Sequence, residues 1–284
     1  MRQIFILGVR FDVVSFDEAL LKIREYLGSN TLHFVATPNP EVLLYAHKNP
    51  SYREILNTSS LNIPDGIGIL WASTVLHRYP FSRDFSFFRG LSLVIYAFLA
   101  LLSIPFFPSF CRKVFPENVT GADLTQAICS LEDDRMKVFL LGAAPGIAQK
   151  TASILQKKNP SLHIVGTASL GYTGEDEKKA IEEIRNSHAS VLFLAYGSPH
   201  QEEWIYRNIQ YFPSLRVAIG VGGTFDFIAG KRKRAPRVFR ILGLEWLFRL
   251  VQEPKRIGRI FNATIFFPII FLFQYFRGKS EKVV

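Results

Sequence analysis

Small polar and acidic side chains follow two apolar runs of the chain. Residues 32–36 are predicted to form a buried strand and are followed by Thr37 and Asn39, and residues 61–63 are followed by Asp65. Strands of an open α/β sheet present their carboxyl ends at one edge, and ligands bind there. The spacing therefore predicts that these side chains meet at a ligand site. The structural alternative is that Asn39 only caps a helix and that Pro-Asp-Gly only forms a turn.

Three later loops have the same position between a predicted strand and a predicted helix. The glycine-rich segment 142–146 could let a phosphate approach the backbone, or could only allow close packing of strand and helix. Gln201 follows the apolar run 190–195, and Asp226 follows a glycine cluster at 220–223. An Asp there could accept hydrogen bonds from a ribose, as acids do in dinucleotide-binding folds, or could cap a helix.

Three arginines near the C-terminus form a basic group. Arg249, Arg256 and Arg259 are seven and three residues apart, a spacing that shares one face of a continuous helix. Guanidinium groups suit a pyrophosphate, and a basic helix face also suits an anionic lipid surface. Nucleic-acid binding is a third reading, which the neighbouring Phe-rich apolar run disfavours.

The elements that position these side chains repeat along the chain. Short apolar runs at 137–142, 162–166, 190–195 and 216–220 alternate with helical patterns, which is typical of βαβ units. Residues 4–9 are predicted to form a first strand, and an amphipathic helix with a capping box follows it. The predicted fold class is α/β, with a Rossmann-like, mostly parallel sheet and helices on both faces.

Charge and composition divide the chain into two predicted parts. Residues 227–284 hold thirteen Lys and Arg against three Asp and Glu, which accounts for the whole formal net charge of +10. We therefore expect a Rossmann-like body at 1–229 and a helical, basic and apolar C-terminal appendage at 230–284 that meets an anionic partner such as a phosphate, a nucleic acid or an acidic lipid. The two cysteines fit a reducing compartment, and the apolar run near the N-terminus is too short for a signal peptide. The expected location is the cytoplasmic face of the cell membrane.

An apolar insertion interrupts the predicted body at about 78–115. Residues 91–110 carry no charge and would measure about 30 Å as a helix, but Pro105 and Pro108 argue against an unbroken one. Sheet-forming segments lie on both sides of the insertion and must stay on one side of a bilayer. We expect the segment to enter the membrane shallowly and to return. The alternative is a soluble flap that packs on the C-terminal appendage.

Seven sequence blocks together resemble the WecG/TagA/CpsF glycosyltransferases, glycosyltransferase family 26. The blocks cover nearly the whole chain outside the insertion and read TPNPE at 37–41, PDGIGI at 64–69, VTGADL at 119–124, LLGAAPG at 140–146, YGSPHQEEW at 196–204, GVGGTFDFIAGKRKRAP at 220–236 and GLEWLFRLVQEPKR at 243–256. The chain departs from the family pattern at Asn118, where an Arg is usual, and in the apolar insertion.

The resemblance implies an inverting, metal-independent glycosyltransferase without a cofactor. It would move an N-acetylmannosamine-type sugar from a UDP-sugar donor to a polyprenyl-diphosphate-linked GlcNAc acceptor during synthesis of a bacterial surface polymer. Two alternatives stay open. One is the same family with another donor, such as a UDP-ManNAc uronate or a UDP-hexose, and the other is a non-catalytic nucleotide-binding module that tethers a biosynthetic complex.

The resemblance also assigns roles to residues. Asp65 would be the general base, Thr37 would be its partner near the acceptor hydroxyl, and Asn39 would hold the donor. Gln201 and Asp226 would help hold the UDP portion of the donor.

It further implies that the body at 1–229 is catalytic and that the appendage at 230–284 faces the membrane and completes the active site. Arg249, Arg256 and Arg259 would close over the diphosphate from the appendage. A carboxylate can take the proton of an attacking sugar hydroxyl, and guanidinium groups can stabilise the leaving UDP where other transferases use a metal ion. The histidines show no metal-ligand spacing.

Overall fold

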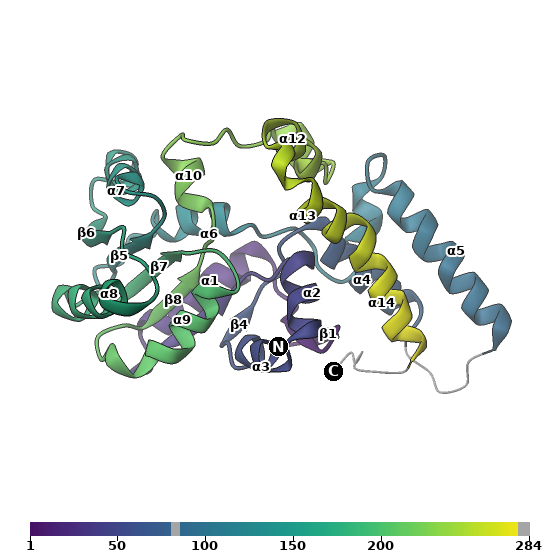
Figure 1. Ribbon diagram of the computed structural model, residues 1–284, viewed down its shortest axis with the longest axis horizontal. Coiled ribbons are helices and arrows are strands. Elements are labelled where there is room, and N and C mark those ends of the chain that lie inside the picture. Colours follow the sequence, from purple (N-terminus) through teal and green to yellow (C-terminus); the bar gives the residue numbers. More distant parts are fainter. Residues whose placement is uncertain (81–85, 278–284) are drawn as a thin grey trace.

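Six parallel strands form the central sheet in the computed structural model, which describes residues 1–80 and 86–277 (Figure 1). The strand order is β4-β3-β8-β7-β5-β6. Their bounds are β3 His33–Ala36, β4 Leu61–Asn62, β5 Lys137–Gly142, β6 His163–Ala168, β7 Val191–Ala195 and β8 Val217–Gly220. Strands β3 and β4 are neighbours, so the two segments predicted to end at one edge do so.

Both faces of the sheet are covered, because alternate residues of a strand point to opposite faces. In β7, Leu192 and Leu194 join one apolar cluster, and Val191 and Phe193 join the other. The helices of the first cluster include α2 Pro40–Lys48, α3 Pro50–Asn57, α4 Ile67–Arg78, α8 Gly174–Ser187 and α9 His200–Asn208. Those in the second are α1 Phe16–Leu27, α6 Gly121–Ile128, α7 Ile147–Lys158 and α10 Thr224–Ile228. The predicted α/β fold with helices on both faces is confirmed.

The prediction of one strand over residues 4–9 is wrong. Strands β1 Gln3–Ile6 and β2 Val9–Asp12 form an antiparallel hairpin separate from the main sheet. The chain reverses at Leu7 and Gly8, which have φ values of 52° and 78°. A two-residue turn with both φ values positive suits the twist of a hairpin. The apolar run conceals it, because only Gly8 is a residue that favours such a turn.

The predicted helix starts are confirmed where capping residues marked them. Ser15 and Glu18 form the expected capping box at the start of α1. Asn39 caps α2, with Pro40 in the first helical position. Helices α7, α8 and α9 begin at Ile147, Gly174 and His200, each after one of the predicted strands, as the βαβ pattern requires. Local capping chemistry therefore fixes the point at which the chain leaves β3 and enters α2.

Helix α4 separates the insertion from the C-terminal helices at the end of the sheet away from β6 (Figure 1). Residues 81–85 of the predicted insertion lie outside the described part of the chain. The rest of it forms α5 Phe87–Ser103, a turn that contains Pro105, and the 3₁₀ helix η1 Pro108–Cys111. Trp71 of α4 donates a hydrogen bond from Nε1 to the Ala97 carbonyl of α5 at 2.9 Å. The other side of Trp71 contacts Phe267 and Phe271 of α14, edge to face.

Arg249, Arg256 and Arg259 do not lie on one continuous helix, which is the condition under which their spacing would place them on a shared face. Helix α12 Glu245–Gln252 carries only the first of them. The chain then turns at Glu253, and Pro254 starts a new helical segment because its ring cannot continue the preceding helix. The remaining C-terminal elements are α11 Arg237–Ile241, η3 Pro254–Arg256, α13 Ile257–Phe261, the π-helical turn η4 Asn262–Phe266 and α14 Phe267–Phe276.

Candidate active site

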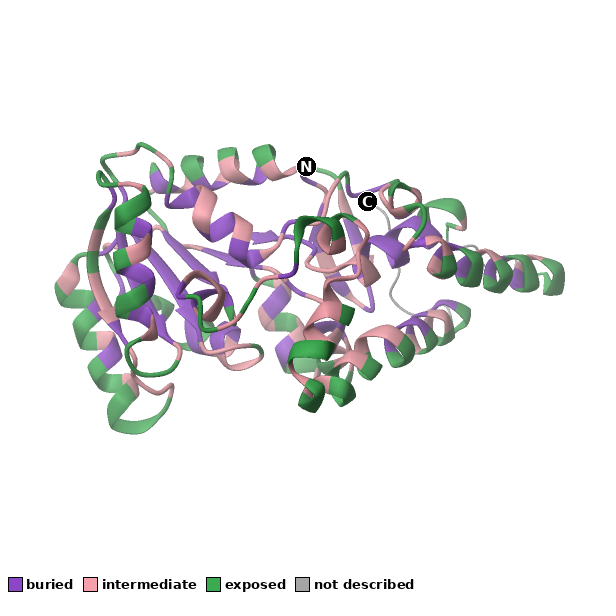
Figure 2. Ribbon diagram, turned by 90° about the horizontal axis from the view of Figure 1, so that it is seen from above, coloured by how far each residue is buried: buried purple, intermediate pink, exposed green. Residues whose placement is uncertain are grey.

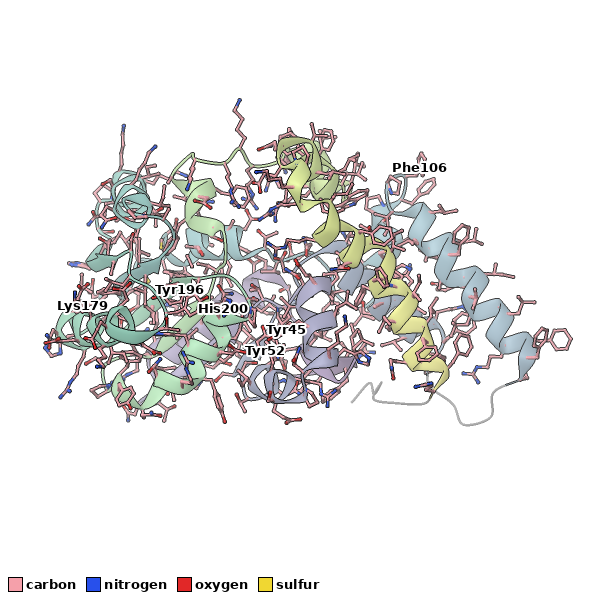
Figure 3. The ribbon with its side chains drawn as sticks, viewed as in Figure 1. Tyr45, Tyr52, Phe106, Lys179, Tyr196 and His200 are labelled. Atoms are coloured by element: carbon pink, nitrogen blue, oxygen red, sulfur yellow. The ribbon has the colours of Figure 1, made fainter. Side chains whose placement is uncertain are left out.

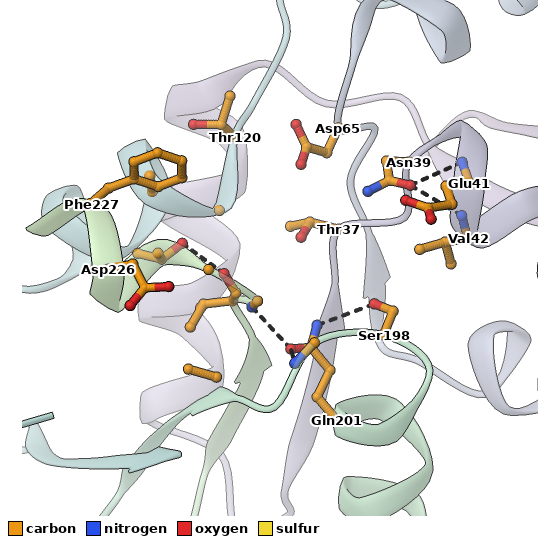
Figure 4. Close-up of a pocket in the computed structure, with 18 of the residues that line it drawn as sticks. Thr37, Asn39, Glu41, Val42, Asp65, Thr120, Ser198, Gln201, Asp226 and Phe227 are labelled. Atoms are coloured by element: carbon orange, nitrogen blue, oxygen red, sulfur yellow. Dashed lines mark hydrogen bonds between the residues drawn. The ribbon is translucent and has the colours of Figure 1, made fainter. Parts of the chain in front are cut away.

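A cavity of about 460 Å³ lies at the carboxyl ends of β3, β4, β7 and β8 (Figure 4). Its wall combines loops of the α/β body with helices of the C-terminal appendage. All eight residues that the sequence predicted as a site line it, namely Thr37, Asn39, Asp65, Gln201, Asp226, Arg249, Arg256 and Arg259. The fold thus brings together side chains that are up to 222 positions apart in the sequence.

Asp65 is held in the turn between β4 and α4. Its backbone N–H donates to the Pro38 carbonyl at 3.1 Å, and the next N–H, of Gly66, donates to Asn118 Oδ1 at 2.6 Å. The residue that departs from the family pattern, Asn118, therefore anchors this turn. The carboxylate of Asp65 and the hydroxyl of Thr37 face the same space (Figure 4).

Burial raises the pKa of Asp65 to about 7, from an ordinary value near 3.8. The positive charges of Arg249 and Arg234 lower this pKa, and the negative charges of Glu245 and Asp123 raise it. A carboxyl group with a pKa near neutrality can both accept and release a proton at physiological pH. Asp65 therefore has the protonation chemistry that a general base requires.

Asn39 caps helix α2 and also lines the cavity. Its side-chain oxygen accepts hydrogen bonds from the backbone N–H groups of Glu41 and Val42, both at 3.0 Å, and so caps α2. The side-chain NH₂ is not used in the cap and lies beside the cavity space (Figure 4). The cap fixes the amide so that its two N–H donors are available to an oxygen in the cavity.

Gln201 joins the loops that follow β7 and β8. Its Oε1 accepts hydrogen bonds from the N–H of Gly197 at 3.1 Å and from the N–H of Gly222 at 2.9 Å. The side chain lies directly over Gly220, where a Cβ atom would come within 2.5 Å of Gln201 Nε2. Gln201 is 3% exposed, so its main contribution in this structure is to fix the shape of the two loops.

A buried acid beside Gln201 was not singled out from the sequence. Glu202 accepts hydrogen bonds from Tyr52 Oη at 3.0 Å, Ser198 Oγ at 2.7 Å and Gln201 Nε2 at 2.8 Å. Burial is the largest influence on the pKa of Glu202 and raises it. Glu202 and Glu203 are adjacent in the sequence and chemically alike. Only the rotational position of each residue around helix α9 could have shown that Glu202 points inward.

Asp226 lies in the first turn of α10 and is partly neutralised. Its carboxylate is 3.4 Å from Arg232 Nε and 3.8 Å from Lys231 Nζ. The N-cap of this helix is Gly223, so Asp226 is not the capping residue. The side chain lines the cavity on the side of β8, opposite Asp65 and Asn39 (Figure 4).

Each of the three predicted arginines forms an ion pair with a glutamate. Arg249 pairs with Glu245 four residues earlier, and Arg256 pairs with Glu253 at 2.7 Å. Arg259 pairs with Glu41, and its Nε and Nη2 atoms lie 2.7–2.9 Å from the two carboxylate oxygens. The Arg259 pair links the appendage to the start of α2. The chain turn at Pro254, rather than a shared helix face, brings the three guanidinium groups to one cavity.

A further arginine from the basic run also lines the cavity. Arg234 donates from Nη1 to Asp123 Oδ1 at 2.7 Å and from Nη2 to Thr120 Oγ1 at 3.0 Å. The basic run is Lys231-Arg232-Lys233-Arg234, and Arg232 lines the cavity as well. The spacing of the run does not show which of its side chains reach the cavity. Arg234 is held there by Asp123, and both of these residues lie in blocks of the family resemblance.

A second cavity of about 210 Å³ adjoins the first at Asp65. It is lined on one side by Gly66, Gly68 and Asn118, and on the other by Ile260 and Ala263 of the appendage. Asp65, Asn39 and the three arginines line both cavities. Asp65 therefore stands where two ligands bound in neighbouring cavities would meet.

The chain matches the model of the glycosyl transferase WecG/TagA/CpsF family over residues 4–88 and 104–281. It belongs to this family. The sequence resemblance is thereby confirmed, and the protein is a glycosyltransferase. Residues 89–103, which form most of α5, lie outside the match.

Two relatives from Staphylococcus aureus support the assignment. The proteins of strains MW2 and NCTC 8325 / PS 47 are each 29% identical to this glycosyltransferase over 271 residues, covering 93% of this chain and 90% of theirs. Both are N-acetylglucosaminyldiphosphoundecaprenol N-acetyl-beta-D-mannosaminyltransferases. Within residues 1–80 and 86–277, no group of three or more His, Cys, Asp or Glu side chains is arranged to hold a metal ion.

Proposed function

We propose that this glycosyltransferase moves an N-acetylmannosamine-type sugar from a UDP donor to polyprenyl-diphosphate-linked GlcNAc, with inversion and without a metal ion. The observation that carries the proposal is the position of Asp65, a carboxyl group with a pKa of about 7 at the junction of two cavities. The names of the S. aureus relatives supply the sugar and the lipid-linked acceptor. The product belongs to the synthesis of a bacterial surface polymer.

The larger cavity is the proposed donor site. Its polar wall carries carboxylate and amide groups at Asp226 and Asn39, which can accept and donate hydrogen bonds to ribose and sugar hydroxyls. Arg249, Arg256 and Arg259 are placed to bind the diphosphate. Gln201 contributes by holding the loops that form the uridine side of the cavity.

The smaller cavity is the proposed acceptor site. Its appendage wall includes Ile260 and Ala263, which suit the first isoprene units of a polyprenyl chain, and the arginines at its mouth suit the acceptor's own diphosphate. A GlcNAc in this cavity would present its hydroxyl to Asp65 and Thr37, which face a common space.

The proposed reaction is a single displacement. The acceptor hydroxyl attacks the anomeric carbon of the donor sugar while Asp65 takes the hydroxyl proton, and Thr37 helps to orient that hydroxyl. The bond between the anomeric carbon and the β-phosphate oxygen breaks, and UDP leaves with an additional negative charge. The guanidinium groups of the appendage stabilise this charge, the task that a metal ion performs in other transferases. Attack from the side opposite the leaving group inverts the anomeric configuration.

The test is a transfer assay with several donors. The protein is incubated with lipid-linked GlcNAc and UDP-ManNAc, a UDP-ManNAc uronate, UDP-GlcNAc or UDP-glucose, with and without excess EDTA. We expect transfer from UDP-ManNAc, insensitivity to EDTA and a β-linked product from an α-linked donor. Preference for another UDP-sugar would replace the proposed donor, and loss of activity with EDTA that returns on addition of Mg²⁺ would contradict the metal-independent mechanism.

A further inference from the structure

Helix α5, most of which lies outside the family match, has two different apolar faces. Its inner face packs on α4 through the buried residues Leu93, Ala97 and Ala100. Its outer face carries large apolar side chains that no other described part of the chain covers, namely Phe87, Phe88, Leu91, Val94, Ile95, Phe98, Leu99 and Leu102. Helices whose partner is only the protein core expose a polar outer face. This one does not.

The apolar surface continues beyond the end of α5. Phe106 and Phe107, in the turn after the helix, are 76% and 69% exposed, and Phe106 projects away from the body (Figure 3). On the other flank of α4, the C-terminal helices expose a second row of apolar residues, namely Ile257, Phe261, Ile265, Phe266, Ile269 and Phe273. Figure 2 shows exposed residues along both α5 and α14, at the same end of the molecule.

The two apolar segments themselves carry only basic charges. Residues 86–113 contain Arg89, Arg112 and Lys113 and no acidic side chain. Residues 254–277 likewise contain basic side chains only, among them Lys255 and Arg277 near the two ends of the helical segment. Basic residues at the ends of an apolar helix attract the headgroups of an anionic lipid surface.

We propose that the outer face of α5 and the Phe106-Phe107 turn insert into the interfacial layer of an anionic bilayer, beside the outer face of α13 and α14. The proposal rests on the proposed function, because a polyprenyl-linked acceptor is itself a bilayer lipid. Three features favour a bilayer over a protein partner: the aromatic and aliphatic composition, the basic ends, and the continuity with the acceptor cavity. Arg112, at the end of the insertion, lines that cavity and donates to the Ile241 carbonyl at 3.3 Å.

The geometry of α5 fits a helix that lies on the membrane and does not cross it. Its 17 residues would span about 25 Å, which is shorter than a hydrocarbon core of about 30 Å. Crossing would also require its inner face to leave α4.

The segment Pro254–Phe276 is long and apolar enough to span a membrane by its length and composition. However, Phe267 and Phe271 are fully buried against α4, and Arg259 faces the cavity. Both helices therefore present one side to lipid and the other to protein. The segment 91–110, for which a shallow membrane entry was predicted, consists of a helix followed by an aromatic turn.

Vesicle binding with matched leucine variants tests the proposal. Leu99 and Leu102 of α5 are 57% and 52% exposed, and Leu21 of α1, on a different part of the body, is 59% exposed. The full chain carrying Leu99→Glu, Leu102→Glu or Leu21→Glu is sedimented with vesicles of phosphatidylcholine containing about one third phosphatidylglycerol. Full burial of a leucine side chain contributes about 1.5–3 kcal/mol, so each α5 variant should bind about tenfold more weakly or worse, and Leu21→Glu should bind as wild type does.

Equal vesicle binding by all three variants and the wild type would overturn the proposal. So would a change of oligomeric state in the α5 variants without a change in vesicle binding, because the face would then join two copies of the chain. Thermal unfolding of each variant confirms that the fold is retained.

Activity assays separate this proposal from the proposed function. With a short-chain, water-soluble acceptor, the α5 variants should transfer sugar at the wild-type rate, and with full-length lipid acceptor in vesicles they should be slower. If the wild-type protein binds vesicles through α5 but transfers sugar to neither acceptor, the proposed function is refuted and the proposed membrane-binding surface is not.

Discussion

The two walls of the large cavity are held in place in different ways. On the sheet wall, polar groups are fixed by hydrogen bonds to backbone: Asn39 caps α2, and Gln201 binds the N–H groups of two loops. On the appendage wall, the polar groups are side chains in ion pairs, as in Arg259 with Glu41 and Arg256 with Glu253. A backbone hydrogen bond must be kept when a ligand binds, but a phosphate oxygen can take the place of a carboxylate in an ion pair with arginine.

This difference separates a preformed site from an exchangeable one. The sheet wall has its binding geometry before any ligand arrives, which reduces the entropy lost on binding. Under the proposed function, the arginines of the appendage wall would exchange their glutamate partners for phosphate oxygens of the donor, and the ion pairs hold the guanidinium groups in place before the donor binds. The predictions below test the two walls separately.

The largest effect is expected at Asp65. Asp65→Asn keeps the shape of the side chain but removes the proton acceptor, so the rate of transfer should fall by about 10²–10⁴-fold with little change in UDP affinity. The matched control is Asp134→Asn in an exposed turn. Turnover of the Asp65 variant within about threefold of wild type would remove this residue from the mechanism.

The stability of the same variant gives an independent check. Because the folded pKa of Asp65 is raised, the protein takes up a proton there on folding between pH 4 and 7, and stability is lost as the pH rises through that range. Asp65→Asn should therefore melt at a higher temperature than wild type at pH 8, and the gain should vanish near pH 4.

A smaller loss of activity is expected on the appendage wall. Arg256→Ala should lower the rate constant for transfer by about 10²-fold, because one donor to the leaving diphosphate is lost. Arg185→Ala on the exposed face of α8 is the control. Steady-state kinetics and UDP titration check the prediction. An unchanged rate constant with only a raised Michaelis constant would mean that Arg256 binds the ground state alone.

Gln201 should affect stability more than chemistry. Gln201→Ala leaves the N–H groups of Gly197 and Gly222 without their buried partner, and an unsatisfied buried group costs about 1–3 kcal/mol of unfolding free energy. Denaturant titration should show this loss, whereas Gln149→Ala on the exposed side of α7 should be neutral. Wild-type stability with reduced UDP affinity would instead make Gln201 a direct ligand of the donor.

The smallest effect is expected at Glu41. Glu41→Gln releases Arg259 from a partly exposed ion pair, a contact that is typically worth less than 1 kcal/mol. UDP should therefore bind the variant up to about fivefold more tightly, with Glu54→Gln on α3 as the control. Weaker binding would show that Glu41 orients Arg259 for the ligand rather than competing with it.

The sequence predicts the sheet wall better than the appendage wall. Thr37, Asn39 and Asp65 follow strands that are parallel neighbours, and the rule that strands end at one edge suffices to bring them together. The start of α2 could also be predicted, because a helix cap depends only on residues that are adjacent in the sequence.

The appendage wall depends on contacts that no local pattern encodes. The three arginines converge because Pro254 breaks the chain and because Arg259 meets Glu41, 218 positions away. The inward direction of Glu202 and the hairpin at Leu7 and Gly8 likewise follow from tertiary packing. Long-range ion pairs and helix phase were therefore outside what spacing alone could establish.

The pH dependence of kcat/KM for sugar transfer tests the role of Asp65 most directly, because this quantity reports the ionisation of the free enzyme. The general base must be unprotonated, and the pKa of Asp65 is about 7. We predict that kcat/KM of the wild type falls about tenfold per pH unit below pH 7, and that the residual activity of Asp65→Asn lacks this descent. A wild-type profile that is flat from pH 5.5 to 8, or an Asp65→Asn profile with the same descent, would contradict the assignment of Asp65 as the base.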